Sequence, residues 1–387
     1  MDLDRIRAET PGTHRGVHLL AAGSSLPSEA VLHAISEYLE LEAAVGGYDA
    51  ARIRHDMLDS VYEDVAALVG AKRREIAIVE NATVAWSHAF YALPLRAGHR
   101  ILTSRSEYAA NYVAYLQRAK RDRVEIEVIP NRPTGEVDVD ALEAMIDERV
   151  GVISVSWIPT NGGLVNPAAA IGEVARRHGI PYLLDACQAV GQMPVNVTEL
   201  GCDFLSETGR KFLRGQRGTG FLYVAERWLA SLEPVMLDHF GAPWVARDRY
   251  VLRDDARRFE TWESSFALRA GLGAAARYAR DLGLEAIRER AWSLAEELRE
   301  RLRALPGATL CDLGSERCAI VSFTLEGHDP ATTVKRLRDE GIFIGVSSPE
   351  NTRLDSEARS LPDLFRAAPH YYNTSHELER LVAALGA

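Results

Sequence analysis

The sequence predicts an α/β protein with a mostly parallel seven-stranded sheet in a large domain and a smaller α+β domain after it. Between about residues 70 and 225, short β-branched runs alternate with helical patterns, which is typical of a parallel sheet covered by helices on both faces. After about Arg258 the pattern changes to one long helical stretch with a few short strands. The length of 387 residues and the hydrophobic content of 47% suit two domains, which we place at 16–260 and at 1–15 together with 261–387.

The large domain is predicted to contain seven strands, at 75–79, 100–103, 124–129, 152–157, 182–185, 204–207 and 220–224. The helices predicted between them cover 83–91, 108–121, 138–146 and 168–177. Ligands of parallel sheets bind at the carboxyl ends of the strands. The residues that follow each strand are therefore the first candidates for a functional site.

The small domain is predicted to begin with a helix at 284–305. A strand at 319–324, a helix at 329–340, a strand at 342–346 and a last helix from Ser375 follow. The polar segment 347–362 is predicted to be a mobile loop.

The charge and the cysteine content exclude several classes of function. The net charge is −10, and no basic cluster is longer than Lys72–Arg74, so we expect no nucleic-acid partner. No apolar run approaches the roughly 18 residues of a membrane span, and the N-terminus lacks an apolar signal core, so we expect a cytoplasmic protein. The four cysteines have no metal-ligand spacing, and we expect reduced thiols and no metal site.

The first polar residues at strand ends suggest an anion site and a planar ligand. Ala82 and Thr83 open a helix after the first strand, where free N–H groups favour phosphate, although a plain helix cap is the alternative. Tyr108 follows the second strand and either stacks on a planar cofactor or joins the core. Asn161 follows the fourth strand in a turn and points to the same edge of the sheet.

The fifth strand ends an apolar run in the carboxylate of Asp185. A buried carboxylate is costly unless it is paired with a cation or saturated by hydrogen bonds. A protonated pyridine nitrogen is one such partner. A helix cap and a metal ligand are the alternatives, but no His or carboxylate cluster lies nearby in the sequence.

The sixth strand leads to Lys211, one of only four lysines among 45 basic residues. Thr208 and Arg210 lie beside it in the sequence, and we expect Arg210 and Arg214 to lower its pKa and to favour a Schiff base. The segment Gly215–Gly220 lacks the ending of a phosphate-binding loop, so a nucleotide-binding protein is the weaker interpretation.

In this order the motifs resemble those of the class V aminotransferases, the family that includes cysteine desulfurases and isopenicillin N epimerase-like proteins. The matching motifs are Ala82-Thr83, Glu107-Tyr108, Asn161, Asp185–Gln188 and Thr208–Lys211, and the resemblance covers about 16–385. It implies fold type I and the cofactor pyridoxal 5′-phosphate (PLP). It also implies that Lys211 carries PLP and that Asp185 pairs with the pyridine nitrogen.

The resemblance assigns the remaining cofactor contacts as well. Gln188 would bond the phenolic oxygen, and Tyr108 would stack on the ring where desulfurases usually carry His. Arg210 likewise replaces the His that usually precedes the lysine. The residues implied in binding the phosphate and the rest of the cofactor are Ala82, Thr83, Asn161, Thr208 and Arg210.

The C-terminal part adds a substrate site and a subunit contact. Arg366 matches the family's arginine that grips the substrate α-carboxylate, with Asn161 as its partner, and a structural salt bridge is the alternative. Arg258–Glu260 resembles the start of the segment that reaches a neighbouring subunit's cofactor, which implies a homodimer. Its continuation departs from the family's Gly-Thr.

One residue of the desulfurases is missing. They carry a nucleophilic cysteine in the loop before the carboxylate arginine, whereas this chain has Ser347 and Ser348 there. None of the four cysteines is predicted to replace it, so we do not expect a protein-bound persulfide.

We therefore predict a PLP enzyme that cleaves a C–S bond by β-elimination from a cysteine S-conjugate or a related amino acid. The general likeness to the PLP enzymes of lincosamide antibiotic biosynthesis implies secondary metabolism. Decarboxylation-coupled oxidative deamination, transamination and epimerisation stay open, because all begin with the same binding of an amino acid to PLP. A non-catalytic PLP-fold regulator is the alternative of another class.

Overall fold

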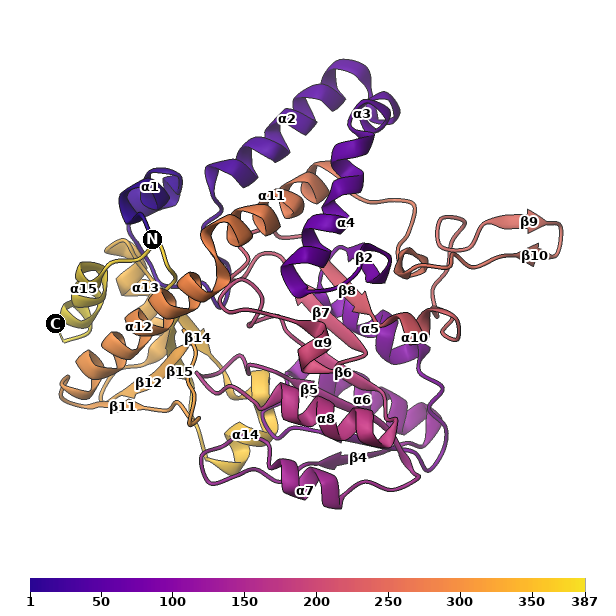
Figure 1. Cartoon of the computed structure of the whole chain (residues 1–387). Helices are drawn as coiled ribbons and strands as arrows, with labels where there is room; N and C mark the ends of the chain where they lie inside the picture. The colour runs from indigo at the N-terminus through magenta and orange to yellow at the C-terminus, as the bar shows by residue number, and fades with distance from the viewer. Residues whose placement is uncertain (387) are drawn as a thin grey trace.

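The computed structural model describes residues 1–386, and a seven-stranded sheet forms the centre of the large domain (Figure 1). Its strands run in the order β2 (Ile76–Val79), β8 (Gly220–Val224), β7 (Phe204–Thr208), β6 (Tyr182–Asp185), β5 (Val150–Ser156), β3 (Arg100–Thr103) and β4 (Glu125–Val128). Strand β8 is antiparallel to both of its neighbours, and the other pairs are parallel. The predicted seven-stranded, mostly parallel sheet is confirmed.

Neighbouring residues of the central strands enter two different cores. Leu183 packs with Trp86, Phe90 and Tyr115 on one face, under α5 (Ala82–Ala92) and α6 (Ala109–Asp122). Leu184 packs on the other face, which is covered by α8 (Ala168–His178). Burial on both faces explains why these strands are continuous apolar runs. Short helices α7 (Val139–Ala144), α9 (Val197–Leu200) and α10 (Glu226–Leu229) complete the layers.

A group of helices that the sequence pattern did not reveal stands at one end of the sheet. It consists of α2 (Glu29–Val45), α3 (Gly47–Ile53), α4 (His55–Val69) and α11 (Phe266–Leu282). Helix α11 packs against α2 and α4 (Figure 1). A Cβ atom on its Gly271 would lie 2.7 Å from Ile35, so the glycine permits the close approach. The predicted boundary at residue 260 stays a prediction, and the helix just after it contacts the large domain. No helix within residues 1–386 combines the length and the apolar character that a bilayer span requires.

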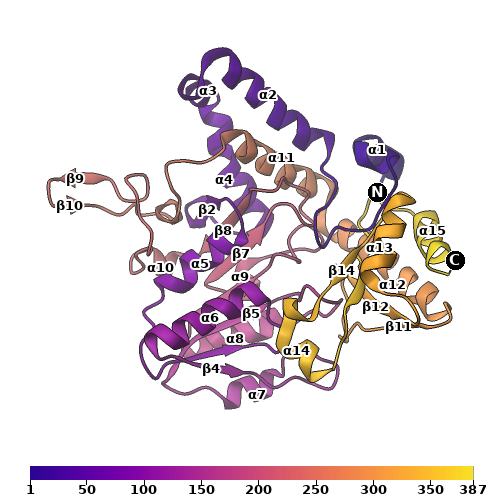
Figure 2. The same ribbon diagram turned by 180° about the vertical axis from the view of Figure 1, so that it is seen from behind.

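The small domain contains a four-stranded antiparallel sheet in the order β11 (Ala308–Leu310), β12 (Val321–Leu325), β15 (Leu364–Ala367) and β14 (Gly345–Ser347). Its helices are α12 (Leu284–Arg303), α13 (Pro330–Asp339) and α15 (Ser375–Leu385), and Figure 2 shows them from behind. The helices predicted at 284–305, 329–340 and from 375 are therefore confirmed.

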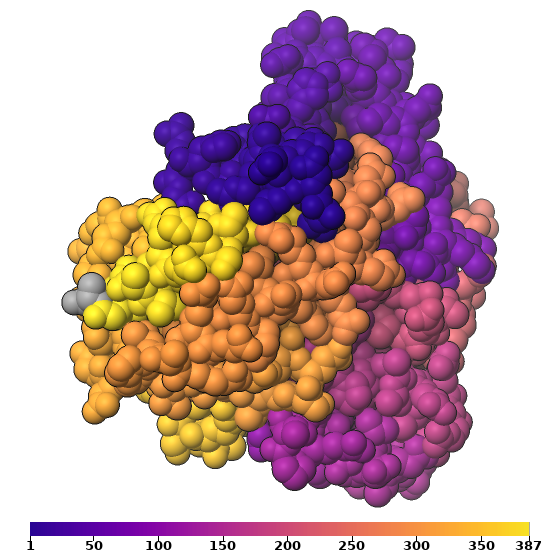
Figure 3. Space-filling model, turned by 60° about the vertical axis from the view of Figure 1, so that its left-hand side comes forward, coloured from indigo at the N-terminus to yellow at the C-terminus, as the bar shows by residue number. Residues whose placement is uncertain are grey.

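The N-terminus packs on the small domain. Strand β1 (Val17–His18) pairs in parallel with β13 (Ile342–Phe343). Arg7, in helix α1 (Leu3–Ala8), donates to the Tyr372 carbonyl at 2.8 Å and to Glu377 at 2.9 Å. In Figure 3 the indigo N-terminal residues lie over the orange and yellow C-terminal ones. The assignment of 1–15 to the small domain stays a prediction, and β1, which falls within the predicted large domain of 16–260, pairs with a strand of the C-terminal part.

The segment predicted as a loop at 347–362 contains regular structure. It forms the 3-10 helix η4 (Pro349–Thr352) and the helix α14 (Arg353–Ala358). Asp355 of α14 forms ion pairs with Arg105 of the large domain and with Arg359, both at 3.1 Å. The prediction of a loop at 347–362 was wrong because polar residues here pair with the large domain and order the segment, as Asp355 does with Arg105.

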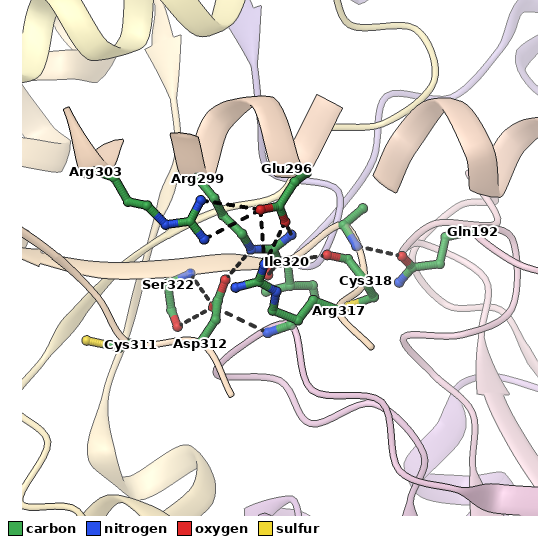
Figure 4. Close-up of polar contacts among 12 residues, drawn as sticks. Gln192, Glu296, Arg299, Arg303, Cys311, Asp312, Arg317, Cys318, Ile320 and Ser322 are labelled. Atoms are coloured by element: carbon green, nitrogen blue, oxygen red, sulfur yellow. Dashed lines mark hydrogen bonds and ion pairs between the residues drawn. The ribbon is translucent and has the colours of Figure 1, made fainter. Parts of the chain in front are cut away.

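A buried ion pair holds α12 to the small sheet (Figure 4). Arg299 Nε lies 2.6 Å from Asp312 Oδ2, and both side chains are fully buried. Arg299 also donates to the carbonyls of Cys318 at 2.9 Å and Ile320 at 2.8 Å. Asp312 accepts the N–H and the hydroxyl of Ser322, both at 2.9 Å. Each charge is thus surrounded by hydrogen-bond partners, which is the condition for burying it.

Replacing Asp312 with alanine should lower the free energy of unfolding by about 3–5 kcal/mol, because the buried guanidinium of Arg299 would lose its counter-charge. Denaturant-induced unfolding measures the loss. Glu173→Ala is the matched control, since its pair with Arg177 is exposed and should contribute at most ~1 kcal/mol. Equal losses for the two variants would contradict the role assigned to the buried pair.

Candidate active site

A cavity lies at the carboxyl ends of the parallel strands. Six of the ten predicted site residues line it: Ala82, Thr83, Tyr108, Asp185, Gln188 and Lys211. The other lining residues are Asn111, Ser156, Ile158, Thr160 and Cys187. The rule that strand ends gather side chains at one edge of the sheet therefore brought these six predicted residues to one cavity, while their functional roles stay predictions.

Asp185 ends β6 with both carboxylate oxygens bonded. The Cys187 N–H donates to Oδ1 and the Asn111 amide donates to Oδ2, each at 3.0 Å. The side chain is 8% exposed. Two donors and no cationic side chain within hydrogen-bond distance leave the carboxylate able to pair with a cation from a ligand.

Lys211 lies opposite Tyr108, with its Nζ 6.0 Å from the centre of the tyrosine ring. Burial lowers the pKa of Lys211, the charge of Asp185 opposes the shift, and the cations Arg210 and Arg366 add to it. A lysine amine with a lowered pKa is more often in the neutral, nucleophilic form. The predicted effect of Arg210 is confirmed.

The predicted effect of Arg214 on Lys211 was wrong. The backbone of Arg214 has a positive φ of 65°, and its side chain points to the N- and C-terminal segments. It donates to the Leu26 carbonyl at 2.7 Å, the Tyr371 hydroxyl at 2.6 Å and Thr10 Oγ1 at 2.7 Å. Arg214 thus joins the domains, and Arg366 from β15 is the second cation near the lysine.

The N-terminus of α5 forms one wall of the cavity. Asn81 caps the helix by accepting the Val84 N–H at 3.1 Å, which confirms the plain-cap interpretation. The cap leaves the N–H groups of Ala82 and Thr83 without intrahelical partners, so an anion can still bind there. Thr208 and Arg210, the other predicted phosphate contacts, do not line the cavity. The Arg210 guanidinium donates to the Gly23 carbonyl.

Gln188 and Arg366 share the partner Thr160. Gln188 Nε2 donates to Thr160 Oγ1 at 3.3 Å, and its Oε1 is buried without a hydrogen-bond partner. Arg366 Nη1 donates to the Thr160 carbonyl at 3.0 Å and to its hydroxyl at 2.8 Å, while its Nε has no partner. Burial, followed by the charge of Arg210, lowers the pKa of Arg366 to about 10. Arg366 remains a cation at neutral pH.

Asn161 faces the small domain. Its amide donates to Thr352 Oγ1 at 2.8 Å and to the Ser348 carbonyl at 3.3 Å, and its oxygen accepts the Ser347 hydroxyl. Both ends of the amide are thus engaged by the segment that leads into η4. The contacts of Asn161 with cofactor and substrate stay predictions.

The residues of the cavity fit pyridoxal phosphate. The unpartnered Gln188 oxygen suits a hydrogen-bond donor of a ligand, while its Nε2 donates to the Ala22 carbonyl at 3.1 Å. The Asp185 carboxylate suits a protonated ring nitrogen, the free N–H groups of α5 suit a phosphate, and Lys211 suits an aldehyde. Within residues 1–386 no group of three or more His, Cys, Asp and Glu side chains could hold a metal ion.

Sequence reasoning did not single out three of the lining residues, Asn111, Thr160 and Cys187. Thr160 and Cys187 each lie beside a predicted residue, and Asn111 lies four positions after Glu107, in the first turn of α6. That spacing was the only available signal for Asn111, since its bond to Asp185 depends on the neighbouring strand.

Comparisons with known proteins agree with this geometry. The family model described as Aminotransferase class-V matches residues 17–381. A probable cysteine desulfurase of Xylella fastidiosa is 30% identical over 403 residues, which cover 99% of this chain and 95% of the relative. A probable cysteine desulfurase of Methanothermobacter thermautotrophicus is 29% identical over 388 residues, which cover 98% and 96%.

Solved structures share the fold along the whole chain. The apo cysteine desulfurase of Thermococcus onnurineus has a TM-score of 0.91 at 24% identity and covers 99% of this chain and 97% of its own. The cystine C–S lyase C-DES, in complex with cysteine persulfide, has a TM-score of 0.87 at 22% identity, with 97% and 99% covered. The predicted fold type is therefore confirmed.

Proposed function

The chain belongs to the aminotransferase class-V family, and on that premise we propose that it is a PLP-dependent enzyme that cleaves the Cβ–S bond of a cysteine S-conjugate or a related amino acid. Family membership, PLP as cofactor and enzymatic activity agree with the sequence prediction. The isopenicillin N epimerase-like branch, secondary metabolism, antibiotic biosynthesis and a cytoplasmic location stay predictions.

The observation that carries the proposal is the cavity that Lys211 shares with Tyr108 and Asp185, with Arg366 close enough to lower the pKa of the lysine. PLP, when bound, supplies an electron sink for a bond broken at Cα. In the proposed arrangement Asp185 holds the ring nitrogen protonated, and Gln188 bonds the phenolic oxygen. Thr83 and the α5 N-terminus hold the phosphate, and we propose Thr208 and Arg210 as further contacts to it.

The substrate side of the proposal rests on Arg366 and Lys211. The free Nε of Arg366 is a donor for the substrate carboxylate. Lys211 accepts the Cα proton as general base. The Cβ–S bond then breaks with its electron pair on sulfur, the sulfur leaves as a thiol after protonation, and water releases pyruvate and ammonium. The neighbour named a cystine C–S lyase supports this choice of reaction.

The test is incubation of the PLP-loaded enzyme with small S-alkyl cysteine conjugates. The proposal expects thiol, pyruvate and ammonium in equal amounts. A 2-oxo acid without thiol would indicate transamination, and a D-amino acid would indicate epimerisation. Carbon dioxide together with ammonia would indicate decarboxylation-coupled oxidative deamination. PLP binding without turnover of any amino acid would favour the non-catalytic regulator.

The proposal does not include sulfur transfer to a protein thiolate, although the curated relatives are described as cysteine desulfurases. All four cysteines are buried. Burial raises the pKa of Cys318 to about 12, and burial together with Asp185 raises the pKa of Cys187. Burial also raises the pKa values of Cys202 and Cys311. A buried, protonated thiol is a poor sulfur nucleophile.

Replacing all four cysteines with alanine or serine should therefore leave the β-elimination rate within about threefold of wild type, apart from packing losses at the buried sites. Product assays measure the rate, and mass spectrometry of the intact protein after incubation with cysteine should detect no persulfide. Loss of activity in a folded, PLP-loaded Cys187→Ala or Cys318→Ala single variant would restore a thiol mechanism.

We also propose a homodimer. The hairpin of β9 (Trp244–Ala246) and β10 (Arg249–Tyr250) extends from the body of the molecule (Figures 1 and 2). Trp244 on it is 75% exposed. An exposed aromatic side chain on a projecting hairpin suits burial against a second copy. The predicted contact through Arg258 finds less support, because Arg258 donates to the Leu232 carbonyl of its own chain at 2.9 Å.

Light scattering should therefore give twice the chain mass of 42.7 kDa, and Trp244→Asp should shift the protein toward monomer by removing apolar contact area. Lys72→Ala, which changes an exposed residue of another surface, is the control. A wild-type monomer with full PLP occupancy would refute the homodimer.

A further inference from the structure

A second buried carboxylate lies behind Asp185. Glu107 is 3% exposed and does not line the cavity. It accepts the Tyr108 N–H at 2.8 Å, the Ser156 N–H at 3.0 Å and the Ser156 hydroxyl at 2.6 Å. It also accepts the Thr103 hydroxyl at 3.2 Å. An acceptor surrounded by donors is arranged for the ionised form.

A fifth donor joins Glu107 to Asp185. The Asn111 Nδ2 group lies 2.9 Å from Glu107 Oε1 and 3.0 Å from Asp185 Oδ2, and it has two hydrogens to donate. Both neighbours are carboxylate oxygens, so only the N–H₂ end of the amide fits between them. The second Asp185 oxygen is held by the Cys187 N–H at 3.0 Å. The orientation of Asp185 therefore depends on an amide that Glu107 holds in place.

We propose that Glu107 is a positioning residue for Asp185: through the Asn111 amide it fixes the Asp185 carboxylate, and its charge strengthens the hold of Asp185 on a cationic ring nitrogen. The inference rests on the proposed contact between Asp185 and the PLP ring. It concerns a residue that touches neither cofactor nor substrate.

The electrostatics of the pair agree with this assignment. Burial raises the pKa of Glu107 to about 7 against the effect of its hydrogen bonds, and the charge of Asp185 adds to the rise. The other titratable side chains that face Glu107 are Tyr115 and Tyr182, whose pKa values burial raises well above 10, so they stay neutral. A cation bound at Asp185 would lower the Glu107 pKa. PLP binding should thus tighten as the pH rises toward about 7, and above 7 Glu107 should add no further pH dependence.

The experiment titrates PLP into apoprotein from below pH 6 up to pH 8 and follows the visible absorbance of the bound cofactor. Glu107→Gln should weaken PLP binding about 10- to 100-fold. The glutamine N–H₂ group would face the donors that now surround the Glu107 carboxylate, and the negative charge of Glu107 would be lost. It should also remove the part of the pH dependence that lies below about 7. Asn111→Ala breaks the bridge but keeps the four other hydrogen bonds of Glu107, and should give a similar loss. The double variant should lose no more PLP affinity than the more affected single variant, since both changes break the same linkage.

Two reference variants separate the possible failures. Glu75→Gln alters another buried glutamate, which accepts the Lys72 and Glu226 N–H groups, and should change stability only. Asp185→Asn reports on the proposed ring contact. If Asp185→Asn changes neither affinity nor absorbance, the ring contact is wrong. Suppose that Asp185→Asn does change the affinity or the absorbance. The positioning role is then overturned if Glu107→Gln and Asn111→Ala bind PLP like wild type. It is also overturned if their losses of PLP affinity add fully in the double variant. Should Glu107→Gln fail to fold, wild-type behaviour of Asn111→Ala alone overturns it.

Discussion

Lys211→Ala is expected to abolish the covalent attachment of PLP while some cofactor remains bound without a covalent bond. Lys211 is the only lysine that lines the cavity, and its pKa is lowered by burial beside Arg210 and Arg366. The same substitution removes the proposed general base at Cα. Loss of such a base alone lowers turnover by about 10²- to 10⁴-fold.

Reduction of the PLP-loaded protein with borohydride, followed by peptide mass mapping, tests the attachment directly. The label should be found on Lys211 in the wild type and on no residue in Lys211→Ala. Lys72 is the matched control, since its ammonium lies on the surface in an ion pair with Glu226 at 2.6 Å. Lys72→Ala should keep the label and the activity. A label on Lys72, Lys120 or Lys335 of the wild type would disprove the assignment.

The sheet and the centre of the site were predictable because both follow from local patterns. A buried apolar strand that ends in a carboxylate, such as Tyr182–Asp185, identifies both an element and a candidate residue. The next strand carries Lys211 to the same edge, so the spatial pairing follows from the parallel topology. Both inferences need only the order of strands and the rule for their carboxyl ends.

The contacts that the sequence could not predict depend on how separate elements pack. Arg214 is three residues from Lys211, yet its left-handed backbone turns it toward Tyr371. Arg366, 155 positions away in the sequence, is instead the second cation near Lys211, because β15 brings it to Thr160 at this edge of the sheet. The bridge from Glu107 through Asn111 to Asp185 likewise joins two strand ends. No periodicity in the sequence encodes such a contact, since it depends on tertiary geometry alone.

Helix α14 shows the same limit in the small domain. The residues 353–358 are polar and gave no apolar stripe, so they were assigned to a loop. The helix is held by the ion pair of Asp355 with Arg105, 250 positions earlier in the sequence. Polar segments that are ordered by long-range ion pairs are indistinguishable from loops in composition.

Asp185→Asn is expected to keep the fold but to lower turnover by at least roughly 10²- to 10³-fold, the cost of removing a preorganised charge from an active site. The asparagine oxygen can still accept the Cys187 N–H. Its new N–H₂ group, however, replaces the oxygen that accepts from Asn111, so one amide must turn. The ring nitrogen then loses both its counter-charge and the geometry that the Asn111 bridge imposes.

The measurement is steady-state turnover of PLP-loaded protein, with the unfolding midpoint recorded in parallel. Asp203→Asn is the matched control. Asp203 is also a buried acid, but it lies just before the first residue of β7 and pairs with Arg227 at 2.6 Å. That control should lose stability and retain turnover per folded, PLP-loaded molecule, whereas Asp185→Asn should show the reverse. Near-normal turnover of Asp185→Asn would mean that Asp185 is only a structural cap. The electron-sink chemistry would then need another source of charge, and the bridge to Glu107 would have no catalytic purpose.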